Sequence, residues 1–126
     1  MGDKKLILAV DDDASVCELY ENGIPSLGYD IVCASSGARA KEILSEKKPD
    51  VILMDIMMPE QDGISLTREI HSDSKTADIP ILVVSGLSDA ATLNDALLFG
   101  AIDYLVKPID FGVLKSKLER AISLKK

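Results

Sequence analysis

The stretch LILAVDDDASV, residues 6–16, carries five apolar residues directly into three consecutive aspartates. A short run rich in Leu, Ile and Val is typical of a strand that is covered on both faces of a parallel sheet. Two unit charges about 4 Å apart repel each other by roughly 4 kcal/mol near a protein surface. We therefore expect partners that offset this repulsion at Asp11, Asp12 and Asp13.

Four more runs of the same kind follow along the chain: DIVCA (30–34), VILMD (51–55), ILVVS (81–85) and DYLVK (103–107). The segments between them have helical spacing of apolar residues and begin after a capping residue, namely Asp13, Ser36, Asp62, Ser88 and Asp110. Strand and helix therefore alternate five times. This alternation predicts an α/β doubly wound sheet.

The first expected helix has an apolar face and a break in its pattern. Its apolar positions are Val16, Leu19, Tyr20, Ile24 and Leu27, and the fourth expected helix buries Leu93, Ala96 and Leu97 in the same way. Proline removes a helical hydrogen bond and clashes with the preceding turn. Gly23 and Pro25 therefore predict a kink or an early end of the first helix.

Length and composition limit the class of protein. With 126 residues, 47% hydrophobic and 28% charged, the chain is expected to form one domain over residues 1–126. Its net charge of -7 argues against direct binding to nucleic acid or to an anionic membrane. The chain has neither an apolar run of about 20 residues nor a signal peptide, so we expect a cytoplasmic location. Cys17 and Cys33 are interpreted as reduced packing residues, with a disulfide as the less favoured alternative.

Polar side chains follow four of the five expected strands. Asp11 and Asp12 follow the first, and Asp55, Ser85 and Lys107 stand at the ends of the third, fourth and fifth. Ligands in open α/β sheets bind beyond the carboxyl ends of the strands, so these residues should converge. Carboxylates suit Mg²⁺, and a carboxylate can attack phosphorus when cations neutralise the transferred oxygens. The set therefore predicts a phosphoryl-transfer site, while Asp13 is interpreted as a helix cap.

These residues resemble the receiver domain of two-component response regulators. The resemblance rests on Asp11-Asp12, the motif D-x-x-M-P-x-x-D-G from Asp55 to Gly63, Ser85, and Y-L-V-K-P from Tyr104 to Pro108. It covers essentially the whole chain and implies a flavodoxin-like (βα)5 domain with a five-stranded parallel sheet in the order 2-1-3-4-5.

The resemblance also implies a role for each site residue. Asp55 would be the phosphoacceptor, and Mg²⁺ would be bound by Asp12, Asp55 and the Met57 carbonyl, with Asp11 acting mainly through a metal-bound water. Ser85 and Lys107 would contact the phosphoryl group. Tyr104 would change rotamer on activation, although a half-buried strand aromatic is the alternative interpretation. The Lys107-Pro108 bond is often cis in this family.

The implied function is a signalling switch rather than a conventional enzyme. A sensor histidine kinase or phosphotransfer protein would phosphorylate the domain, which would catalyse its own phosphorylation and dephosphorylation. The changed surface of the fourth helix, fifth strand and fifth helix would then act on a downstream protein or effector domain, or pair with a second copy of the chain. Because Met57 and Leu87 are apolar where the family varies, we expect a long-lived aspartyl phosphate.

Three alternative functions compete with this interpretation. A haloacid dehalogenase-like phosphatase would have a second Asp two positions after the nucleophile, where this chain has Met57. A flavin or nucleotide binder would need a glycine-rich phosphate loop or stacking aromatics, and the aromatic content is only 4%. A receiver that works without phosphorylation is disfavoured because every expected site residue is present.

Overall fold

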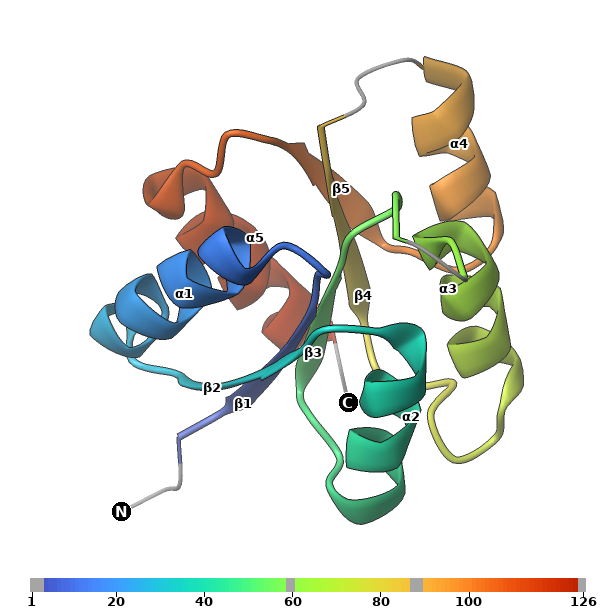
Figure 1. Cartoon of the computed structure of the whole chain (residues 1–126), viewed down its shortest axis with the longest axis horizontal. Coiled ribbons are helices and arrows are strands. Elements are labelled where there is room, and N and C mark those ends of the chain that lie inside the picture. Colours follow the sequence, from blue (N-terminus) through green and yellow to red (C-terminus); the bar gives the residue numbers. More distant parts are fainter. Residues whose placement is uncertain (1–3, 59–60, 87–89, 125–126) are drawn as a thin grey trace.

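A central parallel sheet organises the chain, as Figure 1 shows for the computed structural model, which describes residues 4–58, 61–86 and 90–124. The strands are β1 (Leu6–Val10), β2 (Asp30–Ala34), β3 (Val51–Met54), β4 (Ile81–Ser85) and β5 (Asp103–Val106). They are arranged in the order β2-β1-β3-β4-β5, and all neighbours are parallel. The predicted fold class and strand order are therefore confirmed.

The helices cover the two faces of this sheet. They are α1 (Ala14–Gly23), α2 (Gly37–Glu46), α3 (Gly63–Ser72), α4 (Ala90–Leu98) and α5 (Phe111–Leu124), with a short 3-10 turn η1 (Pro25–Leu27) after α1. Helices α1 and α5 lie on one face, and α2, α3 and α4 lie on the other (Figure 1).

Each face of the sheet has its own hydrophobic core, because successive strand side chains point to opposite faces. On the α1 and α5 side, Ile7 and Ala9 of β1 pack with Tyr20, Leu114 and Leu118. On the other side, Leu8 and Val10 pack with residues of α2, α3 and α4, among them Ala40, Ile43, Leu66, Ile70 and Ala96. Burial on both faces explains why the strand sequences are almost continuously apolar.

Side-chain caps fix where the helices begin. The carboxylate of Asp13 accepts a hydrogen bond from the Ser15 backbone N–H at 2.9 Å. Equivalent caps are made by Ser36 to the Arg39 N–H, by Asp62 to the Ser65 N–H and by Asp110 to the Gly112 N–H. Four of the five predicted caps are confirmed, and Ser88 lies outside the described residues.

The early end of the first helix is also confirmed. Helix α1 stops at Gly23, and Pro25 begins η1, where its missing N–H costs no helical hydrogen bond. Gly28 then ends this turn with a φ of 97°, a left-handed conformation that favours glycine.

Two predicted core positions are wrong. Leu19 is 44% exposed and Leu97 is 38% exposed. The buried positions here are Tyr20 in α1 and Ile24 directly after it, four residues apart, so they define a narrow stripe facing the sheet. Leu19 lies about 100° around the helix from Tyr20 and falls outside that stripe.

The interpretation of the cysteines as reduced packing residues is wrong for this structure. Cys17 on α1 and Cys33 on β2 form a disulfide, with their Cα atoms 6.0 Å apart. Cys33 packs against the core on the α1 side of the sheet, so β2 presents it to the first turns of that helix. The chance that two cysteines meet in this way depends on the packing of α1 on β2, which spacing alone does not give.

Candidate functional site

The carboxyl ends of the strands bring the five predicted site residues to one edge of the sheet. Asp11 and Asp12 follow β1, Asp55 follows β3, Ser85 ends β4 and Lys107 follows β5. Sheet-type backbone hydrogen bonds continue to these positions. They run from the Asp11 N–H to the Ala34 carbonyl at 3.0 Å, from Asp55 to Val10 at 3.0 Å, and from Lys107 to Ser85 at 2.8 Å. The backbone of the site is therefore as fixed as the sheet.

Three carboxylates gather at this edge. Each of Asp11, Asp12 and Asp55 offers an oxygen, and these oxygens all lie within 4.8 Å of one another. Asp11 and Asp55 are buried, with 1% and 6% of their surface exposed, whereas Asp12 is exposed. An acidic set that is closed on the protein side and open on the solvent side suits a hard cation that keeps some of its waters.

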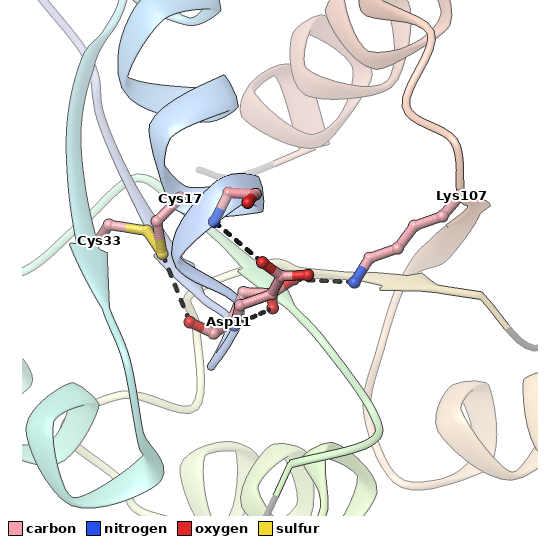
Figure 2. The surroundings of a disulfide bond; sticks show 6 residues. Asp11, Cys17, Cys33 and Lys107 are labelled. Carbon is pink, nitrogen blue, oxygen red and sulfur yellow. Dashed lines mark hydrogen bonds and ion pairs between the residues drawn. A yellow bond between two sulfur atoms is a disulfide. The ribbon is translucent and has the colours of Figure 1, made fainter.

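Lys107 offsets part of this negative charge. Its Nζ lies 2.9 Å from Asp11 Oδ2 and 3.3 Å from Asp55 Oδ1. Figure 2 shows the Lys107 side chain reaching across the site toward Asp11. The Lys107-Pro108 peptide bond is cis, as the sequence resemblance implied. The repulsion expected at Asp11 is thus offset by a cation that lies 96 positions further along the chain.

The three consecutive aspartates have different tasks. Asp11 Oδ1 accepts a hydrogen bond from the Asp13 backbone N–H at 2.9 Å, while Oδ2 binds Lys107. The Asp13 carboxylate caps α1 and does not belong to the carboxylate cluster. The interpretation of Asp13 as a helix cap is therefore confirmed.

The charges of the site alter its protonation. Burial raises the pKa of the Asp55 carboxyl, and the nearby Asp11 raises it further, while Lys107 opposes both effects. For Lys107, burial acts to lower the pKa, but its hydrogen bond and attraction to Asp11, together with Asp55, outweigh burial and raise it. Lys107 is therefore held as a cation, and Asp55 is less readily ionised than an exposed aspartate.

Gly63 is a structural part of the site that the sequence interpretation did not assign. Its backbone N–H donates to the Ile56 carbonyl at 2.7 Å, which fastens the start of α3 below the loop that follows Asp55. A Cβ at this position would collide with the backbone carbonyl oxygen of Asp55. The signal was present in the sequence, because Asp62 caps α3 and Gly63 follows it in the same motif as Asp55.

A cleft of about 260 Å³ opens over the acidic cluster. It is lined by Asp11, Asp12, Asp13, Asp55, Met57, Ser85, Gly86 and Lys107. Met57, predicted to offer its carbonyl, is thus at the same opening, with 66% of its surface exposed. The carboxylate oxygens are the hard donors that Mg²⁺ prefers, so the residues present fit that ion. Leu87 lies outside the described residues.

Among the predicted site residues that the structure describes, Tyr104 alone does not line this cleft. It lies on β5 opposite Val83, is partly buried, and packs against the core on the α2, α3 and α4 side. The Lys117 Nζ lies 5.7 Å from the centre of its ring, and Lys117 also binds Asp103 at 2.9 Å. Tyr104 thus lies on the strand next to the one that carries Ser85.

Comparison with known proteins extends the sequence resemblance. The family model for the response regulator receiver domain matches residues 7–119. The probable transcriptional regulator ycf27 of Guillardia theta is 37% identical over 94% of this chain and 46% of its own length. The transcriptional regulatory protein ZraR of Escherichia coli K12 is 39% identical over 93% of this chain and 26% of its own length. The chain thus spans about a quarter to a half of these curated relatives.

Among solved structures, the receiver domain of the sensor histidine kinase PA1611 from Pseudomonas aeruginosa superposes with a TM-score of 0.87. It is 30% identical, over 96% of this chain and 99% of that one. That structure holds a magnesium ion coordinated in its active-site cleft.

In the described part of the present chain, none of the helices has the length and apolar content needed to cross a membrane.

Proposed function

This chain belongs to the family of response regulator receiver domains of two-component systems, and we propose that it accepts a phosphoryl group on Asp55. One observation carries this assignment to a residue. Asp55 is a buried carboxylate that lines the cleft, with an oxygen within 4.8 Å of oxygens of Asp11 and Asp12 and another contact of 3.3 Å to the Lys107 Nζ. A receiver domain is a signalling switch rather than a conventional enzyme, and the chemistry below serves that switch.

In the proposed step, an Asp55 carboxylate oxygen attacks phosphorus. An O–P bond forms on Asp55 while the P–N bond of a phosphohistidine donor breaks, and the electron pair of that bond stays on the donor imidazole. Lys107, which lies 3.3 Å from Asp55 Oδ1, neutralises charge on the transferred oxygens. The Ser85 hydroxyl, at the end of the neighbouring strand, contacts another of these oxygens.

We assign the metal ligands to the same cluster. Asp12, Asp55 and the Met57 carbonyl would hold Mg²⁺ directly, and Asp11 would act through a metal-bound water. When bound, the ion supplies positive charge that offsets the phosphoryl oxygens and the carboxylates. Asp11 keeps Lys107 in place through the 2.9 Å contact, so the chain itself positions the second cation.

The proposed conformational change involves Ser85 on β4 and Tyr104 on the neighbouring strand β5. After phosphorylation, the Ser85 hydroxyl moves toward the phosphoryl group, and Tyr104 takes the space that is left below α4. The surface of α4, β5 and α5 then differs between the two states. Tyr104 is suited to this change because it is only partly buried and borders that surface.

The partners we propose follow from this switch. A sensor histidine kinase or phosphotransfer protein donates the phosphoryl group, and the output goes to a downstream protein or effector domain, or to a second phosphorylated copy of the chain. The relatives are named as transcriptional regulators, yet the charge of -7 leads us to exclude direct nucleic-acid contact by this domain. We assign residues 1–126 to one receiver domain in the cytoplasm.

Acetyl phosphate, a small phosphodonor, tests the assignment of Asp55. Wild type, Asp55→Asn and Asp13→Asn are incubated with the donor, with and without Mg²⁺, and analysed by mass spectrometry. Wild type and Asp13→Asn should each gain one phosphoryl group only when Mg²⁺ is present, because Asn at position 13 can still cap α1. Asp55→Asn should gain none. Equal labelling of Asp55→Asn would overturn the assignment.

The phosphorylated state should be long-lived. Met57 is apolar and exposed at the cleft, so it cannot orient a water for attack on the aspartyl phosphate. After removal of the donor, mass spectrometry at intervals should show decay over minutes or longer, and Met57→Glu should change that decay rate. A lifetime of seconds in the purified wild type would contradict this expectation.

A further inference from the structure

The Cys17–Cys33 disulfide contacts the backbone of Asp11, a residue of the acidic cluster. The Sγ atom of Cys17 is 3.4 Å from the backbone carbonyl oxygen of Asp11, whose carboxylate binds Lys107 on its other side. Figure 2 shows Asp11 between the disulfide on one side and Lys107 on the other. Asp11 therefore contacts both the disulfide and Lys107, so a change at the sulfur atoms can alter the position of Asp11.

The disulfide is open to solvent from the side. Both cysteines are partly exposed, and together with Asp11 and Asp12 they line a second cleft of about 440 Å³. Thiol–disulfide exchange requires that a thiolate reach one of the two sulfurs. This cleft gives such access, which a disulfide sealed in a core does not.

The disulfide also closes a small mechanical loop around Asp11. The Asp11 N–H donates to the carbonyl of Ala34, the residue after Cys33, and the Cys17 N–H donates to the carbonyl of Asp13. The covalent bond between Cys17 and Cys33 completes this ring of contacts. The segment that carries Asp11 and Asp12 is thereby held between α1 and β2.

We propose that Cys17 and Cys33 form a thiol–disulfide exchange site that controls metal binding at the neighbouring aspartates. A thiolate of a protein or small-molecule dithiol attacks one sulfur, the S–S bond breaks, and the other cysteine leaves as a thiolate. The second thiol of the reductant then attacks the mixed disulfide and releases the first cysteine. The cysteines gain two electrons and two protons and become thiols, and the reductant becomes a disulfide. Oxidation by a small disulfide runs the same exchange in reverse.

Reduction removes the covalent member of this ring of contacts. The first turn of α1 and strand β2 are then joined around Asp11 only by backbone hydrogen bonds and packing. The segment that carries Asp11 and Asp12 is therefore held less firmly in the reduced form. Disulfides in cytoplasmic proteins are mostly transient or redox-sensing, which agrees with an exchange site rather than a permanent staple.

Mg²⁺ titration of the two redox forms tests the proposal, which rests on the metal site assigned under the proposed function. Wild type is oxidised with glutathione disulfide or reduced with dithiothreitol and desalted without oxygen, and free thiols are counted by alkylation and mass spectrometry. Calorimetry with Mg²⁺ should give a dissociation constant about fivefold higher for the reduced form. Equal constants, tighter binding by the reduced form, or failure of either exchange would overturn it.

A serine variant supplies the matched control. The double variant Cys17→Ser, Cys33→Ser should bind Mg²⁺ like the reduced form and should not respond to either reagent. A fivefold response that persists in this variant would place the effect elsewhere and overturn the proposal. The comparison of the two wild-type forms uses one sequence, so it remains decisive if the variant folds poorly.

Hydrogen exchange separates this inference from the metal assignment. The Asp13 backbone N–H donates a hydrogen bond to Asp11 Oδ1. Its hydrogen should exchange with solvent faster in the reduced form, with or without Mg²⁺. If neither form binds Mg²⁺ but this amide responds, the metal assignment fails, while the effect of the disulfide on the Asp11 loop is supported. If the amide exchanges equally in both forms, the proposed coupling is wrong.

Discussion

The Asp55 carboxylate, the proposed phosphoacceptor, destabilises the folded state when it is ionised. Its carboxylate is buried beside Asp11, and its pKa is raised by burial first and by Asp11 second. A group with a raised pKa in the folded state holds its proton more tightly there than in the unfolded chain. As the pH rises from 3.8 through the folded pKa, the unfolded chain therefore loses its proton first and stability falls. At pH 7 the full penalty is present.

Asp55→Asn should therefore stabilise the domain at neutral pH. Asn cannot ionise, and Lys107 keeps its 2.9 Å contact with Asp11, so no buried cation is left alone. We expect the free energy of unfolding at pH 7 and without Mg²⁺ to rise by about 1 kcal/mol, and the gain to vanish near pH 3. Urea denaturation at both pH values measures it. A loss of stability at pH 7 would show that the charged Asp55 is favourable in the fold.

Gly63 is required by a close approach of two backbones. A methyl group at this position would meet the backbone carbonyl oxygen of Asp55, a residue whose N–H is bonded to Val10 of the sheet. Gly63→Ala should lower the free energy of unfolding by about 1–3 kcal/mol, the usual cost of overpacking. Gly86→Ala is the matched control, because nothing lies within 4 Å of its added Cβ, and its change should stay within about 0.5 kcal/mol. Equal effects in denaturant titrations would contradict this explanation.

At the scale of one element, Asp62 determines where α3 begins. Its carboxylate accepts hydrogen bonds from the Ser65 N–H at 2.9 Å and from the Ser65 hydroxyl at 3.0 Å. The backbone bond from Ser65 is the largest cause of the lowered pKa of Asp62. Asp62→Ala should cost about 1 kcal/mol of stability at pH 7, whereas Asp62→Ser should retain most of it.

The pH dependence of this cap has a definite sign. Because the folded pKa of Asp62 is depressed, its contribution is present above the unfolded pKa of 3.8 and is lost as the pH falls through the lower folded value. The difference in unfolding free energy between wild type and Asp62→Ala should therefore shrink below pH 3.8. A difference that is constant from pH 7 to pH 2 would mean that the charge of Asp62 has no part in the cap.

The elements show how far the sequence alone leads. The apolar runs predict the five strands because both faces of the sheet are buried, and β3 and β5 merely end one residue earlier than predicted, before Asp55 and Lys107. The helix starts are predictable because caps are local. The prediction for Leu19 is wrong because a ten-residue helix buries only a narrow stripe, whose direction depends on packing. The strand order came from the family resemblance.

Some features of the site could likewise be predicted from the sequence, and others could not. Asp11, Asp12, Asp55, Ser85 and Lys107 could be predicted together because parallel strands bring their carboxyl ends to one edge. The steric need for Gly63 and the meeting of Cys17 with Cys33 depend on distances between elements. A position-by-position reading of one sequence gives residue types and spacing, but it does not give these distances.

For the whole molecule, the sheet holds like charges together and a cation relieves them. Mg²⁺ that binds only the folded state should stabilise it by RT ln(1 + [Mg²⁺]/Kd), about 1.4 kcal/mol at ten times Kd. For a domain of this size, that is roughly 5 °C in Tm. Asp12→Ala should abolish most of the Mg²⁺-dependent increase, because its carboxylate belongs to the cluster, while Asp13→Asn should keep it. Thermal denaturation followed by circular dichroism at several Mg²⁺ concentrations measures both. If Asp12→Ala gained as much as wild type, the ion would be stabilising another part of the molecule, and the three carboxylates would owe their compatibility to Lys107 alone.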